Sequence, residues 1–117
     1  MPAAILSTDL MLGSQLSGAA ARTGVSVQSC GSAEKLLERI APGDTALVIL
    51  DLGLPALDVA ALVAAIRQRS ATAKIIAFGP HVHKERLAAA TAAGCDQVMS
   101  RGQFHATMDE LLLEHAG

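Results

Sequence analysis

The sequence contains no Trp, no Tyr and only two Phe among its 117 residues, so aromatic rings contribute little to its core. Apolar residues nevertheless make up 51% of the chain, and most of them are Ala, Leu, Val and Ile. Charged residues make up 17%, below the roughly 25% of an average soluble protein. This composition excludes a disordered chain and favours helices packed closely on a buried sheet. The length suits one domain, and we expect a single domain over residues 1–117.

The sequence also lacks long apolar runs and clusters of basic residues. Its longest uncharged stretch, Leu10 to Ala21, is interrupted by glycines and polar residues, whereas a membrane-spanning helix needs about 20 apolar residues. No Lys or Arg precedes Arg22, so the basic start of a secretory signal is missing, and we expect a cytoplasmic location. We therefore expect no segment that crosses a membrane. The net charge of −2 and the absence of a basic run argue against direct binding to nucleic acid.

Cysteine is scarce as well. Cys30 and Cys95 are too few for a disulfide framework and lack the CxxC spacing of metal or redox sites. We therefore expect two buried free thiols.

Apolar strand patterns alternate with helical ones along the whole chain. Val25 to Cys30 alternates with a period of two, whereas Ala46 to Leu50 is continuously apolar, as in a strand covered on both faces. Helical stripes follow each strand, and Pro42 with Gly43 is expected to end the second helix. The expected strands are Ala3 to Ser7, Val25 to Cys30, Ala46 to Leu50, Lys74 to Phe78 and Gln97 to Met99.

Five strand–helix units predict a flavodoxin-like (βα)5 fold. Parallel neighbours need right-handed crossover helices, which gives a doubly wound, five-stranded parallel sheet in a three-layer α/β/α sandwich. The expected strand order is 2-1-3-4-5, with the switch point between the first and third strands. Asp9 follows the first strand and Asp51 ends the third, so both carboxylates should face the crevice there. The same order places Cys30 and Cys95 on opposite edges of the sheet.

Two neighbouring carboxylates repel each other unless a positive charge lies between them. Mg²⁺ is the usual partner of one or two protein carboxylates, and a carboxylate so placed can also attack phosphorus. The stretch Ala46 to Asp58 (ALVILDLGLPALD) resembles the phosphoacceptor segment of bacterial response-regulator receiver domains of two-component systems. Ala3 to Asp9 resembles the family's first strand with its acid, and Ala88 to Val98 (AAATAAGCDQV) its fourth helix and fifth strand.

The resemblance implies roles for three residues. Asp51 matches the aspartate that receives the phosphoryl group from a histidine kinase or phosphotransfer protein. Asp9 matches one acid of the pair that holds Mg²⁺, and Gly53 matches the residue whose backbone carbonyl completes the metal site. The function implied is phosphorelay signalling rather than enzyme activity, with partners bound at the face of the fourth helix, fifth strand and fifth helix.

Four positions depart from the family pattern. Thr8 replaces the second acid, which should weaken Mg²⁺ binding, and Gly79 replaces the Ser or Thr that closes on the phosphoryl group. Gln97 replaces the switching aromatic residue. Ser100 replaces a lysine that makes a charge-assisted contact with phosphate. Arg101 comes one position later and would face the opposite side of a continuing strand, although from a loop its long side chain could swing back.

Simpler roles exist for several of these residues. Asp51 could cap the following turn, and Asp9 and Asp58 could cap helices. His81 and His83 have an HxH spacing but no third ligand, so we expect solvated turn residues.

Two functions therefore remain open. One is a receiver in which Asp51 is phosphorylated but the switch is impaired. The other is a pseudo-receiver that binds protein partners regardless of phosphorylation. A haloacid-dehalogenase-type phosphatase is disfavoured because Gly53 stands where that class needs a second acid, and a flavin site is disfavoured because there is no phosphate cradle or stacking ring.

Overall fold

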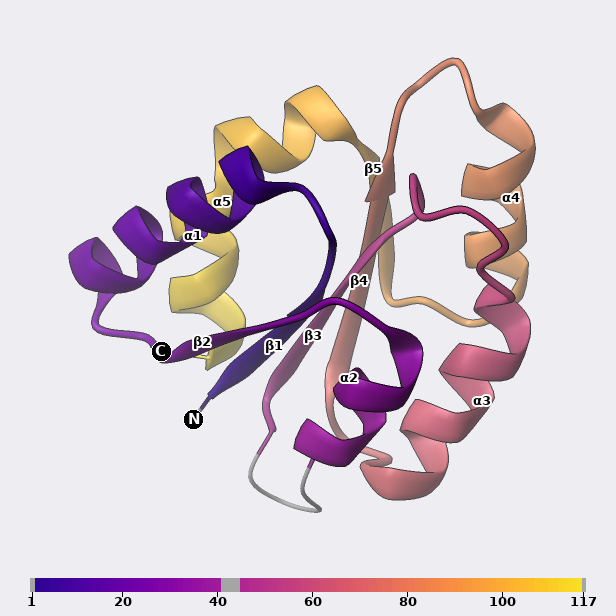
Figure 1. Ribbon diagram of the computed structural model, residues 1–117, viewed down its shortest axis with the longest axis horizontal. Helices are drawn as coiled ribbons and strands as arrows, with labels where there is room; N and C mark the ends of the chain where they lie inside the picture. The colour runs from indigo at the N-terminus through magenta and orange to yellow at the C-terminus, as the bar shows by residue number, and fades with distance from the viewer. Residues whose placement is uncertain (1, 41–44, 117) are drawn as a thin grey trace.

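The computed structural model describes residues 2–40 and 45–116, and within them strands and helices alternate in the expected order. Figure 1 shows the arrangement. The strands are β1 (Ala3–Leu6), β2 (Val27–Cys30), β3 (Leu47–Asp51), β4 (Lys74–Gly79) and β5 (Gln97–Ser100). The helices are α1 (Leu10–Thr23), α2 (Ala33–Arg39), α3 (Val59–Arg69), α4 (Lys84–Ala92) and α5 (Arg101–Ala116).

The five strands form one parallel sheet in the order β2-β1-β3-β4-β5, which confirms the predicted topology. Strand β1 lies between β2 and β3, with Leu6 paired to Cys30 on one side and to Leu50 on the other. The carboxyl ends of β1 and β3 are therefore neighbours, as the switch-point argument requires.

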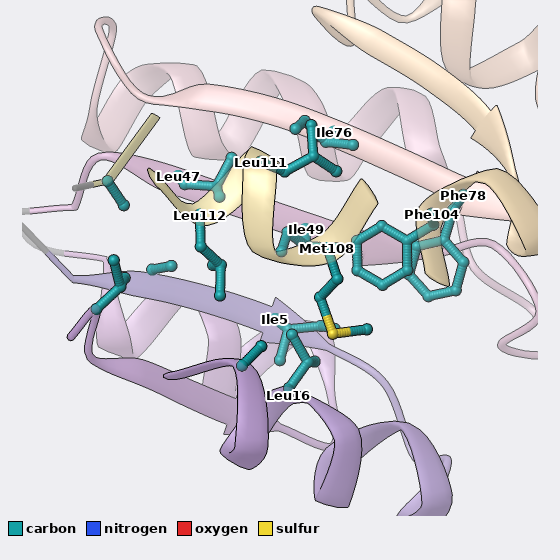
Figure 2. Packing of buried hydrophobic residues seen from close by; sticks show 14 of the residues in the cluster. Ile5, Leu16, Leu47, Ile49, Ile76, Phe78, Phe104, Met108, Leu111 and Leu112 are labelled. Atoms are coloured by element: carbon teal, nitrogen blue, oxygen red, sulfur yellow. The ribbon is translucent and has the colours of Figure 1, made fainter. Parts of the chain in front are cut away.

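Helices cover both faces of the sheet. Helices α1 and α5 lie side by side on one face, and α2, α3 and α4 cover the other (Figure 1). Successive strand residues alternate between the two layers, because side chains along a strand point to opposite faces. Ile5 and Ile49 pack against α1 and α5, as Figure 2 shows, whereas Leu6 and Leu50 belong to the cluster under the other helices.

Several strand ends differ by one or two residues from the sequence prediction. Strand β2 begins at Val27 rather than at residue 25, because its partner β1 begins only at Ala3, which pairs with Val27. Strand β5 continues to Ser100, and α5 begins at once with Arg101, without a connecting loop. The predicted helix stop at Pro42 and Gly43 lies outside the described residues.

The two cysteines are free thiols at opposite edges of the sheet, as predicted. Cys30 is buried at the end of edge strand β2, and Cys95 is partly buried just before the other edge strand, β5. Burial raises the pKa of the Cys95 thiol to about 11, so it is protonated and unreactive at neutral pH. Within the two described ranges, no helix is long and apolar enough to span a membrane.

A charged contact ties the starts of β4 and β5 to α3. The Asp96 carboxylate accepts hydrogen bonds from the Ile75 N–H at 2.8 Å and from the Arg67 guanidinium at 2.9 Å. Arg67 also donates to the carbonyl of Ala73. Burial alone would raise the pKa of Asp96, but the Ile75 N–H and Arg67 outweigh it and lower that pKa. The contact therefore stabilises the ionised carboxylate.

We predict that Asp96→Ala lowers the free energy of unfolding at pH 7 by about 1.5–3 kcal/mol, the usual contribution of hydrogen bonds to a charged group. Because the pKa is lowered on folding, this contribution is complete above about pH 4 and is lost as the pH falls further. Urea unfolding at several pH values measures both effects. Asp109→Ala, which removes only the exposed ion pair with Arg22, is the control and should change stability much less. Equal losses in the two variants would contradict the prediction.

Candidate functional site

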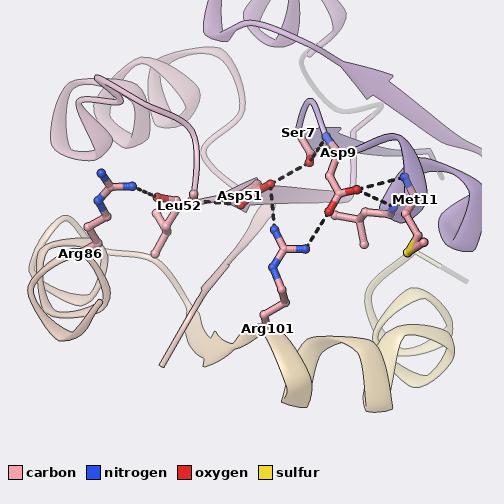
Figure 3. A network of polar contacts seen from close by, with 9 residues as sticks. Ser7, Asp9, Met11, Asp51, Leu52, Arg86 and Arg101 are labelled. Carbon is pink, nitrogen blue, oxygen red and sulfur yellow. Dashed lines mark hydrogen bonds and ion pairs between the residues drawn. The ribbon is translucent and has the colours of Figure 1, made fainter. Parts of the chain in front are cut away.

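Asp51 is the last residue of β3, the strand that lies between β1 and β4. The residue is buried, with 4% of its surface exposed, although it carries a charge. A carboxylate at this depth needs polar partners, because desolvation disfavours an unpaired charge. Figure 3 shows these partners.

Each oxygen of the Asp51 carboxylate accepts a hydrogen bond. The hydroxyl of Ser7 donates to Oδ2 at 2.8 Å, and the backbone N–H of Gly53 donates to Oδ1 at 2.9 Å. Ser7 follows directly on Leu6, whose pairing with Leu50 brings Ser7 opposite Asp51. The contact with Gly53 is the turn-capping role that the sequence allowed for Asp51.

Asp9 has two functions at the neighbouring strand end. Its Oδ1 accepts hydrogen bonds from the N–H groups of Met11 and Leu12, so it is the N-cap of α1, as predicted. Its Oδ2 faces the crevice and pairs with Arg101 at 2.9 Å. The N–H of Leu12, followed by Arg101 and Met11, lowers the pKa of Asp9, and burial opposes this only in part.

The guanidinium of Arg101 lies between the two carboxylates (Figure 3). One terminal nitrogen contacts Asp9 Oδ2 at 2.9 Å, and the other lies 3.5 Å from Asp51 Oδ2. Its central carbon also lies 5.5 Å from the centre of the Phe78 ring, a cation–π contact. Arg101 reaches this position because β5 ends at Ser100 and the chain turns directly into α5. A side chain on the next strand residue would have pointed away.

The sequence of this chain matches the family model of the response regulator receiver domain over residues 8–111. The chain belongs to the response regulator receiver domain family. The resemblance drawn from the sequence is thereby confirmed. No curated protein matches the sequence.

Solved receiver structures share the fold at low sequence identity. A CheY-like receiver domain protein from Methanospirillum hungatei superposes with a TM-score of 0.80 at 18% identity, over 97% of this chain and 90% of the other. A response regulator from Thermotoga maritima gives 0.74 at 16% identity, over 97% and 96%. A signal receiver domain from Bermanella marisrubri gives 0.76 at 18% identity, over 97% and 96%.

Receiver domains are generally signalling modules rather than enzymes, and they interact with histidine kinases or phosphotransfer proteins. They typically bind Mg²⁺ at the acidic site. The residues present in this receiver domain do not fit a divalent ion as they are arranged. The two Oδ2 atoms that face the crevice already share a guanidinium, and the described residues contain no group of three or more His, Cys, Asp or Glu able to hold a metal.

Of the other residues named from the sequence, Thr8, Gly53 and Ser100 follow or end strands at this edge of the sheet, whereas Gln97 lies at the opposite end of β5. Thr8 is exposed on the loop between β1 and α1. Gly53 packs closely against the side chain of Asp51, and a Cβ built on Gly53 would lie 3.0 Å from Asp51 Oδ1. Ser100 accepts a hydrogen bond from the N–H of Gln103 at 3.1 Å, so its hydroxyl is engaged at the start of α5. Gln97 is exposed at the start of β5.

Residues expected to have structural roles behave accordingly. Asp58 is the N-cap of α3 and accepts a hydrogen bond from the N–H of Ala61. His81 and His83 are both exposed in the turn before α4.

Sequence reasoning missed Ser7 and left the position of Arg101 open. Ser7 could have been found by counting register, because β1 and β3 were expected to be neighbours and the residue after β1 then meets the end of β3. The position of Arg101 depends on where β5 gives way to α5. The sequence pattern alone did not define where that helix begins.

Gly79 is buried at the end of β4, where the family pattern has a hydroxyl. A Cβ built at Gly79 would lie 3.2 Å from the Cβ of Leu52 and 3.9 Å from a methyl of Leu87. The first of these contacts is too close for an ordinary packing distance, and it involves an atom attached directly to the backbone. Leu52 therefore occupies part of the space that a Ser or Thr side chain would use.

We predict that Gly79→Thr destabilises the fold by about 1–3 kcal/mol, the usual effect of overpacking a filled site. Denaturant unfolding measures the change. Gly13→Ala is the matched control, because nothing lies within 4 Å of its Cβ and alanine favours a helix, so its stability should be unchanged or higher. A Gly79→Thr variant as stable as the wild type would show that Leu52 yields without strain.

Proposed function

We propose that this chain is a receiver domain of two-component phosphorelay signalling in which Asp51 is the phosphoacceptor and the conformational switch is impaired. The observation that carries the proposal is the position of Arg101, 3.5 Å from the buried carboxylate of Asp51. The family pattern places a cation at the end of β5, and Ser100 occupies that position here. Arg101 supplies the missing positive charge from the next residue.

The reaction is an in-line attack of an Asp51 oxygen on the phosphorus of a phosphohistidine or a small acyl phosphate. The new oxygen–phosphorus bond forms as the bond to the donor's leaving atom breaks, which leaves an aspartyl phosphate and the free imidazole or carboxylate. Arg101 is placed to offset negative charge on the transferring group.

Two features make this reaction slow. Both oxygens of Asp51 already accept hydrogen bonds, from Ser7 and from Gly53. These bonds stabilise the negative charge of the carboxylate and make its oxygens weaker nucleophiles. The side chain is also only 6% exposed, so an incoming phosphoryl group must displace neighbouring atoms to reach it.

The response to phosphorylation is weak for a separate reason. Receivers of the usual pattern draw a hydroxyl at the end of β4 toward the phosphoryl group and move an aromatic residue on β5. Here Gly79 has no side chain, Leu52 fills the adjacent space, and Gln97 is exposed. The face of α4, β5 and α5, where partners are expected to bind, therefore receives little signal from Asp51.

We expect slow, substoichiometric labelling when the protein is incubated with acetyl phosphate in a Mg²⁺-containing buffer. Intact mass spectrometry detects the addition of one phosphoryl group, and an ordinary receiver serves as the positive control. Asp51→Asn should abolish the labelling, whereas Asp58→Asn, which alters only the cap of α3, should retain it. An unlabelled wild type, under conditions that label the ordinary receiver, would remove Asp51 as phosphoacceptor.

The second candidate is a pseudo-receiver that binds protein partners regardless of phosphorylation. One observation favours it: Arg101, Ser7 and Gly53 already satisfy the carboxylate of Asp51, so the site is stable without a phosphoryl group. Binding of a partner through α4, β5 and α5 should then be the same for the wild type and for Asp51→Asn. A pull-down or titration compares them, and a loss of binding in the variant would count against this candidate.

A further inference from the structure

The crevice contains two carboxylates and one guanidinium, and their arrangement has a consequence for metal binding. We propose, building on the function proposed above, that Arg101 is the built-in cation of the pocket and takes the place that a divalent metal ion has in other receivers. The domain then holds its acidic residues in position without Mg²⁺.

The carboxylate oxygens that could coordinate a metal are already engaged. Asp9 Oδ1 caps α1 and Asp51 Oδ1 accepts the N–H of Gly53, so each residue presents only Oδ2 to the crevice. Arg101 contacts both of these Oδ2 atoms, one through each terminal nitrogen. A metal ion binding the same two oxygens must displace the guanidinium or lie beside it as a like charge.

The charge balance favours the guanidinium as well. Asp9 and Asp51 together carry two negative charges, and Arg101 reduces the net charge of the three side chains to −1. Thr8 adds no charge where the family pattern has a further acid. The affinity of a carboxylate site for a hard divalent cation depends on its ligand charge, so this site attracts the metal less than a site with three free acids.

The position of Arg101 is also set by its neighbours in the structure. It is the first residue of α5, and its guanidinium lies near the ring of Phe78. That ring stacks on Phe104, one turn further along α5, with ring centres 4.3 Å apart and planes within 6° (Figure 2). A tethered cation loses no translational freedom on binding, which gives it an advantage over a free ion.

The test is metal binding by the whole chain, measured with Mn²⁺ as the probe by electron paramagnetic resonance and by thermal unfolding. We expect the wild type to show no binding and no thermal shift at millimolar Mn²⁺. Arg101→Ala should bind Mn²⁺ at least about tenfold more tightly, because the net charge of the site becomes more negative by one. Arg101→Lys should stay close to the wild type, since it keeps the charge.

Two further variants show where the metal binds. Arg22→Ala removes an exposed arginine that pairs with Asp109 between α1 and α5, and it should gain no Mn²⁺ affinity. The double change Arg101→Ala with Asp9→Asn should lose the gain, because the asparagine side chain can still cap α1 but carries no charge. A gain that persists in the double variant would place the metal elsewhere and overturn the proposal.

The wild type decides the matter even if Arg101→Ala fails to fold. Wild-type protein that binds Mn²⁺ as tightly as an ordinary receiver overturns the proposal. If Arg101→Ala is unfolded by circular dichroism, Arg101→Gln replaces it, since Gln keeps the length and polarity of much of the side chain. A folded variant without any gain in Mn²⁺ affinity also overturns it.

Labelling by acetyl phosphate separates this proposal from the proposed function. In this reaction Asp51 captures the phosphoryl group and acetate leaves. If Arg101 replaces the metal, a chelator should not reduce the labelling of the wild type. If labelling requires a divalent ion, the proposal that Arg101 replaces the metal is wrong, whereas Asp51 is still the phosphoacceptor. If the wild type is never labelled and also binds no Mn²⁺, Asp51 is not the phosphoacceptor, whereas the proposal that Arg101 replaces the metal stands.

Discussion

Repulsion between two carboxylates is the constraint around which the functional end of this molecule is built. The parallel sheet brings the ends of β1 and β3 together, so Asp9 and Asp51 lie near each other in a crevice. Arg101 offsets the repulsion by contacting both carboxylates. Ser7 and Gly53 donate hydrogen bonds to the two oxygens of Asp51. The start of α5, the loop after β1 and the loop after β3 all meet at this ion pair.

The same contacts hold the two acids and the neighbouring loops together in this receiver fold. A receiver of the usual pattern responds to phosphorylation through a hydroxyl after β4 and a mobile aromatic residue on β5. In this chain the space beside Gly79 is taken by Leu52, and Ser100 caps α5 instead of facing a phosphate. We propose that these contacts, which are present before any phosphoryl group arrives, weaken the switch.

Much of the fold was predictable because it depends on patterns that repeat along the chain. Alternation of apolar strands with amphipathic helices predicted the sheet order, and that order placed Asp9 and Asp51 together. The ends of elements were less certain, because pairing partners decide them: β2 begins at Val27 only because β1 begins at Ala3. The contact from Ser7 to Asp51 follows from the same register. It needed an extra step of counting rather than new information.

The sequence by itself determined the layered α/β/α fold, the crevice and its two acids, since hydrophobic periodicity and chain connectivity fix which strand ends are neighbours. Tertiary structure alone decided the position of the cation. Whether Arg101 points into the crevice depends on β5 ending at Ser100 and α5 beginning at once, a boundary set by the packing of Phe104 on Phe78 and by the hydrogen bond from Gln103 to Ser100. The packing of Phe104 on Phe78 joins residues distant in sequence, and no local pattern records it, whereas the hydrogen bond from Gln103 to Ser100 is local.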